Sequence, residues 1–275
     1  MVKRNITKSD DQGVSEAIGF MLIFTIVIAG IGLVTLYGYP LLLQQQVSAD
    51  EKIMEKNMIV LQNDMKSLAY KTVPFKETSL KIGGGALTVY NSSYNPSSST
   101  LKIYNKDFPG TPYIDAFTPG ELRYESVSAK TDISLQNGAV VMRPRINPGS
   151  AMISEPRWFY DTQTNTMVIN LINITSTDIM AKEGIGTVQM ALVGVPEYNN
   201  YQEDINTFLY LEYTPNSVQD YSVAWNNYFI NTLGMTQTGG GPPGTGVSIK
   251  YRLPTDTNRP VTLIIKKFEV EIKSI

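Results

Sequence analysis

The chain contains no cysteine and no histidine among its 275 residues. Without cysteine it can form no disulfide, and it lacks the two side chains that transition metals bind most strongly. The missing histidine also removes the commonest general base and the Ser-His and Cys-His pairs of nucleophilic catalysis. No dense acidic loop suggests a calcium site. We therefore expect no catalytic, cofactor-binding or metal-binding residues and expect that the protein is not an enzyme.

The chain also has little excess charge of either sign, with 23 Lys and Arg against 25 Asp and Glu. Nucleic-acid-binding domains usually carry a clustered basic face, so we expect no nucleic-acid partner. Ser99 and Lys102 have the Ser-Lys spacing of some acylating enzymes, but no second motif of those enzymes accompanies them. The triple-glycine runs at 83–85 and 239–241 are followed by no Gly-Lys-Ser/Thr, which excludes a phosphate-binding loop.

Charge is absent altogether from residues 17–43, which are predominantly apolar. A helix needs about 20 such residues to cross a bilayer. Lys3, Arg4 and Lys8 precede this stretch, and the first charge after it is Asp50. Since basic residues favour the cytoplasmic side, we expect a single-pass protein of the cell membrane with a cytoplasmic N-terminus and an extracellular C-terminal part.

Three interpretations of this apolar segment remain open. It could be a plain signal-anchor that stays in the membrane. It could be a secretory signal peptide, although the apolar core of such peptides usually spans about 7–15 residues and ends in small residues. The third interpretation rests on the residues that lead into the segment.

The run Gly13-Val14-Ser15-Glu16-Ala17-Ile18-Gly19-Phe20 resembles the N-terminus of archaeal type IV pilin-like proteins. The resemblance implies that a prepilin peptidase cuts between Gly13 and Val14, and that the retained apolar helix packs into a filament core. It departs from the family pattern at Asp11-Gln12, where a basic residue would be expected before the cut. An uncut, single-pass member of the same family is therefore an alternative.

Four residues of this helix are candidate assembly residues. Glu16 lies at the helix N-terminus, where the macrodipole favours a carboxylate, and it could pair with the freed α-amino group of a neighbouring subunit. Gly19, Gly30 and Gly32 would allow helices to approach closely in lipid or in a bundle. The expected partners are the membrane, other copies or other pilin-like subunits, and the peptidase.

A polar neck follows at residues 44–72, and its apolar residues recur at heptad-like spacing. They are Val47, Met54, Met58, Leu61, Met65 and Leu68. With the apolar segment this predicts one long helix from Val14 to Thr72, which Pro40 could kink. The apolar stripe could pair with another helix in a coiled coil, or it could pack against the protein's own C-terminal domain.

After Pro74 the pattern changes to alternating strands and turns. Residues 86–91 and 100–105 share a Leu-x-Val/Ile-Tyr-Asn pattern across a polar loop and predict a hairpin. A short helix is expected after Pro215, with Ser217 and Asp220 as a capping box and Gly234 as its end, and residues 239–244 are expected to form a flexible surface loop. Further strands are expected at 121–127, 131–135, 139–143, 166–175, 186–195, 207–213, 246–253 and 260–273.

The predicted fold class is therefore α+β: a long N-terminal helix, transmembrane and then amphipathic, followed by a β-rich, sandwich-like head with one short helix. The predicted organisation is a leader at 1–13, a transmembrane and neck helix at 14–72 and an extracellular head at 73–275. Within the head, the segment 133–142 and the strand after it resemble uncharacterised archaeal pilin-like membrane proteins, in which an Asn-Gly-Ala-Val hairpin precedes a Pro-containing segment and an apolar strand.

Two asparagines of the head match the N-glycosylation acceptor pattern, Asn91 in a loop and Asn173 in a strand. The expected function is that of a pilin-like surface protein acting in assembly or adhesion, with the helix as packing core or anchor and the head exposed. The alternative is a membrane-anchored ligand-binding or sensor module. A membrane-bound enzyme that uses carboxylates comes third.

Overall fold

The computed structural model describes the backbone from Asp10 and the side chains from Ser15, except residues 72, 92–97, 108 and 147–148. The chain divides into two compact units, Met1–Ala49 and Asp50–Ile275. The neck residues from Asp50 onward thus belong to the same compact unit as the head. The two units are described separately below.

From Asp10 onward the N-terminal unit is helical, as the sequence predicts. It contains α1 (Asp10–Leu33), a π-helical turn η1 (Val34–Gly38) and the beginning of α2 (Tyr39–Tyr70). Pro40 explains the turn, because proline has no N–H for the carbonyl of Leu36 and its ring crowds that carbonyl. The backbone N–H of Tyr39 donates instead to the carbonyl of Val34. The predicted helix end at Thr72 lies outside the described residues, and the described helix ends at Tyr70.

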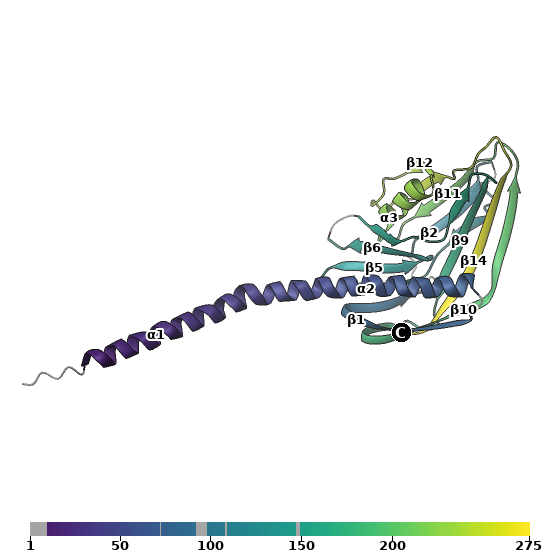
Figure 1. Ribbon diagram of the computed structural model, residues 1–275. Helices are drawn as coiled ribbons and strands as arrows, with labels where there is room; N and C mark the ends of the chain where they lie inside the picture. The colour runs from purple at the N-terminus through teal and green to yellow at the C-terminus, as the bar shows by residue number, and fades with distance from the viewer. Residues whose placement is uncertain (1–9, 72, 92–97, 108, 147–148) are drawn as a thin grey trace, which may run out of the picture. The chain divides into compact units, whose positions relative to one another are not determined.

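The described residues of the C-terminal unit form a larger sheet of nine strands and a smaller sheet of five (Figure 1). The larger sheet has, in spatial order, β7 (Ala151–Ser154), β6 (Ala139–Pro144), β5 (Thr131–Gln136), β4 (Glu121–Ser126), β1 (Phe75–Tyr90), β10 (Ala181–Glu203), β14 (Val261–Ser274), β9 (Thr166–Thr175) and β8 (Phe159–Asp161). The smaller sheet has β12 (Thr236–Gly240), β13 (Ile249–Arg252), β11 (Leu209–Thr214), β2 (Thr100–Asn105) and β3 (Ile114–Phe117). Of the paired strands, β9 and β14 run parallel and the others antiparallel.

Both faces of the larger sheet bury apolar side chains, against different partners. Along β9, Met167, Ile169 and Leu171 belong to a core shared with the smaller sheet and α3 (Ser222–Asn227). Ile172 and Ile174, on the opposite face, belong to a second core shared with α2. Because successive side chains of a strand point to opposite faces, the smaller sheet and α2 cover opposite faces of the larger sheet. The head is therefore layered like a sandwich, with the neck helix as a third layer.

The neck helix packs against its own head, which was one of the two interpretations of its apolar stripe. Met54, Met58, Leu61, Met65 and Leu68 are all fully buried in the second core. Side chains on the other side of the helix are exposed, for example Ile53 and Val60. The stripe is thus occupied within one chain and offers no seam for a coiled coil.

The predicted hairpin of residues 86–91 and 100–105 is wrong. The first segment ends β1, which pairs with β10 and β4 in the larger sheet. The second segment is β2, which pairs with β11 and β3 in the smaller sheet. Both segments have one buried face, so each satisfies the alternating pattern without pairing with the other. The chain between them passes from one sheet to the other.

The predicted start of the short helix is also wrong, since α3 begins at Ser222 and not at Ser217. Asn216 accepts hydrogen bonds from the backbone N–H groups of Val218 and Gln219, at 2.7 and 3.0 Å, which forms a turn in place of a capping box. The helical stretch continues as a π-helical turn, η2 (Tyr228–Thr232), and Gly234 follows with a φ of +70°, as expected for a glycine that ends a helix.

The region expected as a flexible loop, 239–244, is a strand over its first two residues. Thr236–Gly240 forms β12 and pairs with β13. The glycines permit this pairing, because a Cβ at Gly240 would collide with the backbone carbonyl oxygen of Ser248. In the other glycine run, a Cβ at Gly83 would lie 2.5 Å from the carboxylate of Asp50 on α2. These glycines serve close approach of the backbone.

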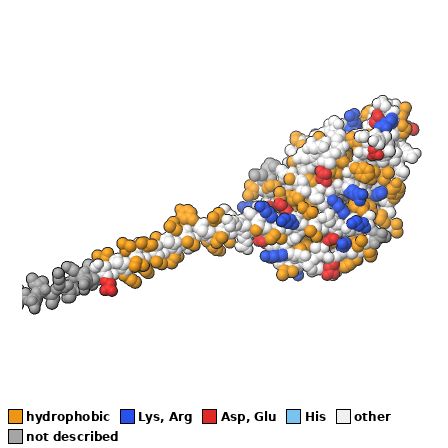
Figure 2. Space-filling view, viewed as in Figure 1, with side chains coloured by type: hydrophobic (Ala, Val, Ile, Leu, Met, Phe, Trp, Pro, Cys, Tyr) orange, Lys and Arg blue, Asp and Glu red, His pale blue; other side chains and the backbone are white. Residues whose placement is uncertain are grey.

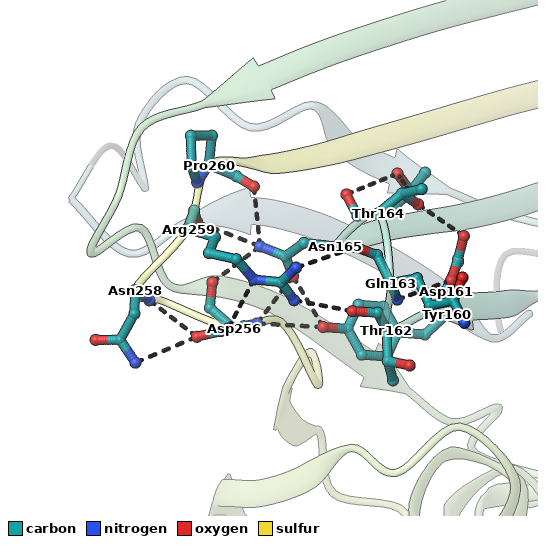
Figure 3. A network of polar contacts seen from close by, with 11 residues as sticks. Tyr160, Asp161, Thr162, Gln163, Thr164, Asn165, Asp256, Asn258, Arg259 and Pro260 are labelled. Atoms are coloured by element: carbon teal, nitrogen blue, oxygen red, sulfur yellow. Dashed lines mark hydrogen bonds and ion pairs between the residues drawn. The ribbon is translucent and has the colours of Figure 1, made fainter.

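At one tip of the larger sheet, a polar network joins the β8–β9 turn to the loop that precedes β14 (Figure 3). The side chain of Asn165 is buried and its Nδ2 donates to the carbonyls of Asp256, Arg259 and Pro260 at 2.9, 3.2 and 2.9 Å. Its Oδ1 accepts from the Tyr160 hydroxyl at 2.8 Å and from the Asp256 N–H at 2.9 Å. One amide side chain thus links, by hydrogen bonds, two loops that are distant in sequence.

Candidate functional site

The apolar segment of the N-terminal unit has no partner in the described part of the chain. From Ile18 to Leu43, the large apolar side chains are between 42% and 73% exposed. Between these two residues they are Phe20, Met21, Leu22, Ile23, Phe24, Ile26, Val27, Ile28, Ile31, Leu33, Val34, Leu36, Tyr37, Tyr39, Leu41 and Leu42. Among the described residues, the helix that contains them is the one long and apolar enough to cross a membrane. It is a candidate membrane anchor, since soluble proteins rarely expose so large a contiguous apolar surface to water.

The few polar groups of this segment are compatible with lipid. The hydroxyl of Thr25 donates to the carbonyl of Met21 at 2.7 Å, and that of Thr35 donates to the carbonyl of Ile31 at 2.8 Å. Bonds of this kind satisfy a hydroxyl within its own helix, as a hydrocarbon environment requires. Tyr37 and Tyr39 are exposed near the end of the segment, where tyrosine is enriched at membrane–water interfaces.

The structure places three of the four candidate assembly residues on one side of α1. At about 100° per residue, Gly19 and Gly30 lie about 20° apart around the helix axis, and Glu16 lies within about 60° of both. Gly32 lies on the opposite side, about 140° from Gly19. A Cβ at any of the three glycines would meet no atom within 4 Å. One helix face therefore combines a carboxylate with two positions of close approach.

The proposed processing position, Gly13 and Val14, falls within the helical backbone of α1, but its side chains lie outside the described residues. Cleavage there stays a prediction.

The segment 133–142 forms the β5–β6 hairpin, and its turn holds the neck helix. Asn137 and Gly138 have φ values of +46° and +72°, which is the geometry of the tight turn that an Asn-Gly pair favours. The buried Gln62 of α2 donates from Nε2 to the carbonyls of Gly138 at 2.7 Å and Glu155 at 3.1 Å. The role of Gln62 was not predicted from the sequence. Its position directly after Leu61, which belongs to the buried stripe, was a signal that its side chain could reach the head.

Beyond the C-terminal end of α2, the same face of the larger sheet is hollowed into an open groove of about 620 Å³. Its floor is formed by four neighbouring strands, β10, β14, β9 and β8, and Ala69 and Tyr70 of α2 form one side. The other lining residues are Arg157, Phe159, Val168, Asn170, Pro196, Glu197, Tyr198, Ile264, Lys266 and Phe268. Sequence reasoning missed this groove because its residues come from five separate segments.

Basic side chains surround the groove. Arg157 and Lys266 line it, and Lys66 and Lys71 line an adjoining hollow of about 440 Å³ that shares Tyr70 and Arg157. Burial and the charge of Arg157 both lower the pKa of Lys66. Burial also raises the pKa of the Tyr70 hydroxyl well above its usual value. Figure 2 shows basic and hydrophobic side chains together on this face of the head.

Carboxylates inside the head are used for structure. Glu121 pairs with the buried Arg123, and its Oε2 accepts from the Ser134 hydroxyl at 2.5 Å. Asp132 accepts from Arg145 Nε at 2.6 Å, and burial raises the pKa of its carboxyl. The cavity beside Glu121 measures about 10 Å³, which is room for at most one water molecule.

The Ser-Lys spacing is not a pair in space. Ser99 is buried and its hydroxyl lies 3.5 Å from Gln136 Oε1, whereas Lys102 forms an ion pair with Asp115 at 3.0 Å. Across the described residues, no three acidic side chains gather in a way that could hold a metal ion.

The two candidate glycosylation asparagines line one hollow of about 420 Å³. Asn91 donates from Nδ2 to the carbonyl of Ser176 at 2.9 Å, and Asn173 accepts from the N–H of Gly120 at 3.1 Å. Both are half-buried, and Ser92 and Ser93 of the first acceptor pattern lie outside the described residues. Their modification stays a prediction.

Comparison with known proteins gives one assignment. No curated protein and no solved structure matches the chain. A family model matches residues 12–272, which includes the apolar helix, the neck and almost the whole head. The chain therefore belongs to the family of unknown function DUF7289.

Proposed function

We propose that the protein is a pilin-like cell-surface protein that is held in the membrane by its apolar helix, assembles through that helix and displays the head outside. The observation that carries the proposal is the exposed apolar surface from Ile18 to Leu43. A helix of this kind can be covered by lipid, by the same helix of neighbouring subunits, or by each in turn during assembly.

The burial of the neck supports the choice of this helix as the assembly surface. The apolar stripe from Met54 to Leu68 is occupied by the head of the same chain. In the described part of the chain, the longest apolar surface without a partner thus precedes residue 44. On that surface, Glu16, Gly19 and Gly30 share one side, as an interface built on close approach and a single ion pair requires.

Processing at Gly13 tests the pilin-like part of the proposal. We expect the mature protein from native membranes to begin at Val14, as measured by mass spectrometry of its N-terminal peptide. The freed α-amino group would then lie close in sequence to Glu16. A mature protein that begins at Met1 or Val2 would contradict processing and would leave a permanent single-pass anchor.

Glu16→Gln tests assembly. We expect the variant to reach the membrane and fold its head normally but to lose most of its higher-order complexes, because glutamine cannot form the ion pair with a neighbour's α-amino group. The complexes are measured by crosslinking in native membranes followed by size analysis. Glu55→Gln, which removes one carboxylate from the neck, is the matched control. Complexes of normal amount and size in Glu16→Gln would contradict the role of Glu16.

A second function, that of a membrane-anchored binding module, is favoured by a specific observation. The groove beyond α2 has the size of a ligand site and is lined by aromatic, apolar and basic side chains. The two functions are compatible in one molecule, since the groove belongs to the head and the assembly surface to the apolar helix. A membrane-bound enzyme receives less support, because the buried carboxylates Glu121 and Asp132 are engaged with arginines.

A further inference from the structure

The groove beyond α2 presents aromatic rings at an open surface. Phe159 and Tyr198 are 48% and 57% exposed, and the ring of Tyr70 packs edge-on against Phe268 with centroids 5.3 Å apart. The Arg157 guanidinium lies 5.0 Å from the centroid of Tyr70, and the Lys266 ammonium lies 5.3 Å from that of Tyr198. Two rings of the groove, Tyr70 and Tyr198, thus each have a cation over them.

The cations of this groove exceed the acids that face them. Arg157 and Lys266 line the groove, Lys66 and Lys71 line the adjoining hollow, and none of the four forms an ion pair with another described residue. The one acid that lines the groove, Glu197, pairs with Lys267 at 3.2 Å, and Glu155 lies near Lys66. The C-terminus of α2 contributes a partial negative charge of only about half a unit. An anionic partner would therefore complement the groove.

The backbone of the groove floor limits what kind of partner fits. β14 and β9 pair with each other and with a further neighbour on the other side, so the middle of the floor offers no free sheet edge to which a peptide could add as a strand. The edge strand β8 also borders the floor, but it is only three residues long and gives a peptide little to pair with. The groove is open, so it does not provide the closed apolar cavity that a lipid chain would need. Sugar rings, in contrast, present apolar faces that pack on aromatic rings and substituents that reach neighbouring charges.

We propose that this groove binds an acidic polysaccharide, with sugar rings on Tyr198 and Phe159 and carboxylate groups on Arg157 and Lys266. The proposal names a ligand class for the second function given above, and it rests on that function, in which the head is a binding module. Recognition by paired charges predicts that binding weakens as salt concentration rises.

The test uses the full-length protein in phosphatidylcholine nanodiscs and polygalacturonate as the probe, with uncharged dextran for comparison. Arg157→Gln/Lys266→Gln should weaken polygalacturonate binding about tenfold or more, because glutamine cannot form a charge-assisted hydrogen bond to a carboxylate. Lys106→Gln/Arg252→Gln is the matched control. It removes two cations that lie over the Phe208 ring, outside the groove, at 5.3 and 5.8 Å. It should leave binding within about twofold.

Tyr198→Ala separates saccharide binding from simple charge attraction. Removal of the ring should weaken polygalacturonate binding about fivefold and leave weak binding of polyglutamate unchanged. The proposal is overturned if wild-type protein does not bind polygalacturonate, or if the two double variants bind it equally well. Stronger binding of polyglutamate, of oligothymidylate or of anionic vesicles would assign the groove to another partner. Membrane retention of the same variants, measured in parallel, reports separately on the anchoring helix.

Discussion

Leu61→Ala is expected to lower the free energy of unfolding of the head by about 2–5 kcal/mol. Leu61 is fully buried where α2 meets the larger sheet, among the apolar side chains of β1, β4, β5, β9, β10 and β14. Truncation removes part of this apolar packing and leaves a cavity that the surrounding strands can fill only in part. The helix would keep its intrinsic stability, because leucine and alanine are both good helix formers.

The change can be measured by urea unfolding of the full-length protein in nanodiscs, followed by tryptophan fluorescence. The chain has two tryptophans, Trp158 and Trp225, and both belong to the core of the head. Val60→Ala is the matched control, because Val60 directly precedes Leu61 in the same helix but is 46% exposed. It should change the free energy of unfolding by less than about 0.5 kcal/mol.

The same pair of variants tests packing within one chain against packing between chains. If the stripe instead formed a coiled coil between subunits, the destabilisation by Leu61→Ala would depend on protein concentration. Equal effects of the two substitutions, or a concentration-dependent destabilisation, would contradict the packing of the neck on its own head.

Much of the architecture follows from periodicity in the sequence. The strands predicted at 121–127, 131–135, 139–143 and 166–175 are confirmed as β4, β5, β6 and β9, because each buries at least one face and so alternates or is apolar throughout. The long helix is also confirmed, and its neck repeats apolar residues at helical spacing because these residues are buried against the head. The segment predicted at 186–195 is part of a strand that extends from Ala181 to Glu203, and its outer parts are largely exposed and polar, so they carry no apolar signal.

What the sequence could not predict depends on pairing between distant segments. The alternation of β1 and β2 reports that each has a buried face, but it does not say which neighbour each strand takes. The short strands β3, β7, β8 and β12 lie at sheet edges and have too few buried residues to be recognised. The groove is even harder to predict from the sequence, because it is formed only where α2 ends over four strands.

The candidate assembly residues illustrate the same limit. Composition identifies Gly19, Gly30 and Gly32 as small residues in an apolar helix, and helical spacing along the sequence groups Gly19 and Gly30 with Glu16. Neither says which neighbour this side of the helix contacts. The second resembling segment, 133–142, shows the converse. Its Asn-Gly-Ala-Val hairpin was implied by the resemblance, whereas its hydrogen bond with Gln62 needed the three-dimensional structure.

Asn165→Ala is expected to destabilise the head by about 2–4 kcal/mol, through two separable effects. The first is the removal of the buried amide that joins the β8–β9 turn to the loop before β14, with its donors to three carbonyls and its acceptor for Tyr160 and Asp256. Groups left without a partner after such a truncation cost about 1–3 kcal/mol each unless water replaces the amide. The second is backbone strain, because Asn165 has a φ of +52°.

Asn206→Ala isolates the second effect. Asn206 has a φ of +67° but is exposed, and its side chain makes no hydrogen bond to the other described residues. It should therefore cost only the strain of a left-handed alanine, about 1 kcal/mol. The difference between the two variants, measured by urea unfolding with tryptophan fluorescence, reports the contribution of the hydrogen bonds in Figure 3. Equal destabilisation in both variants would mean that water satisfies these groups as well as Asn165 does, and that the two loops are held by Arg259 and its bonds to Thr162 and Gln163 instead.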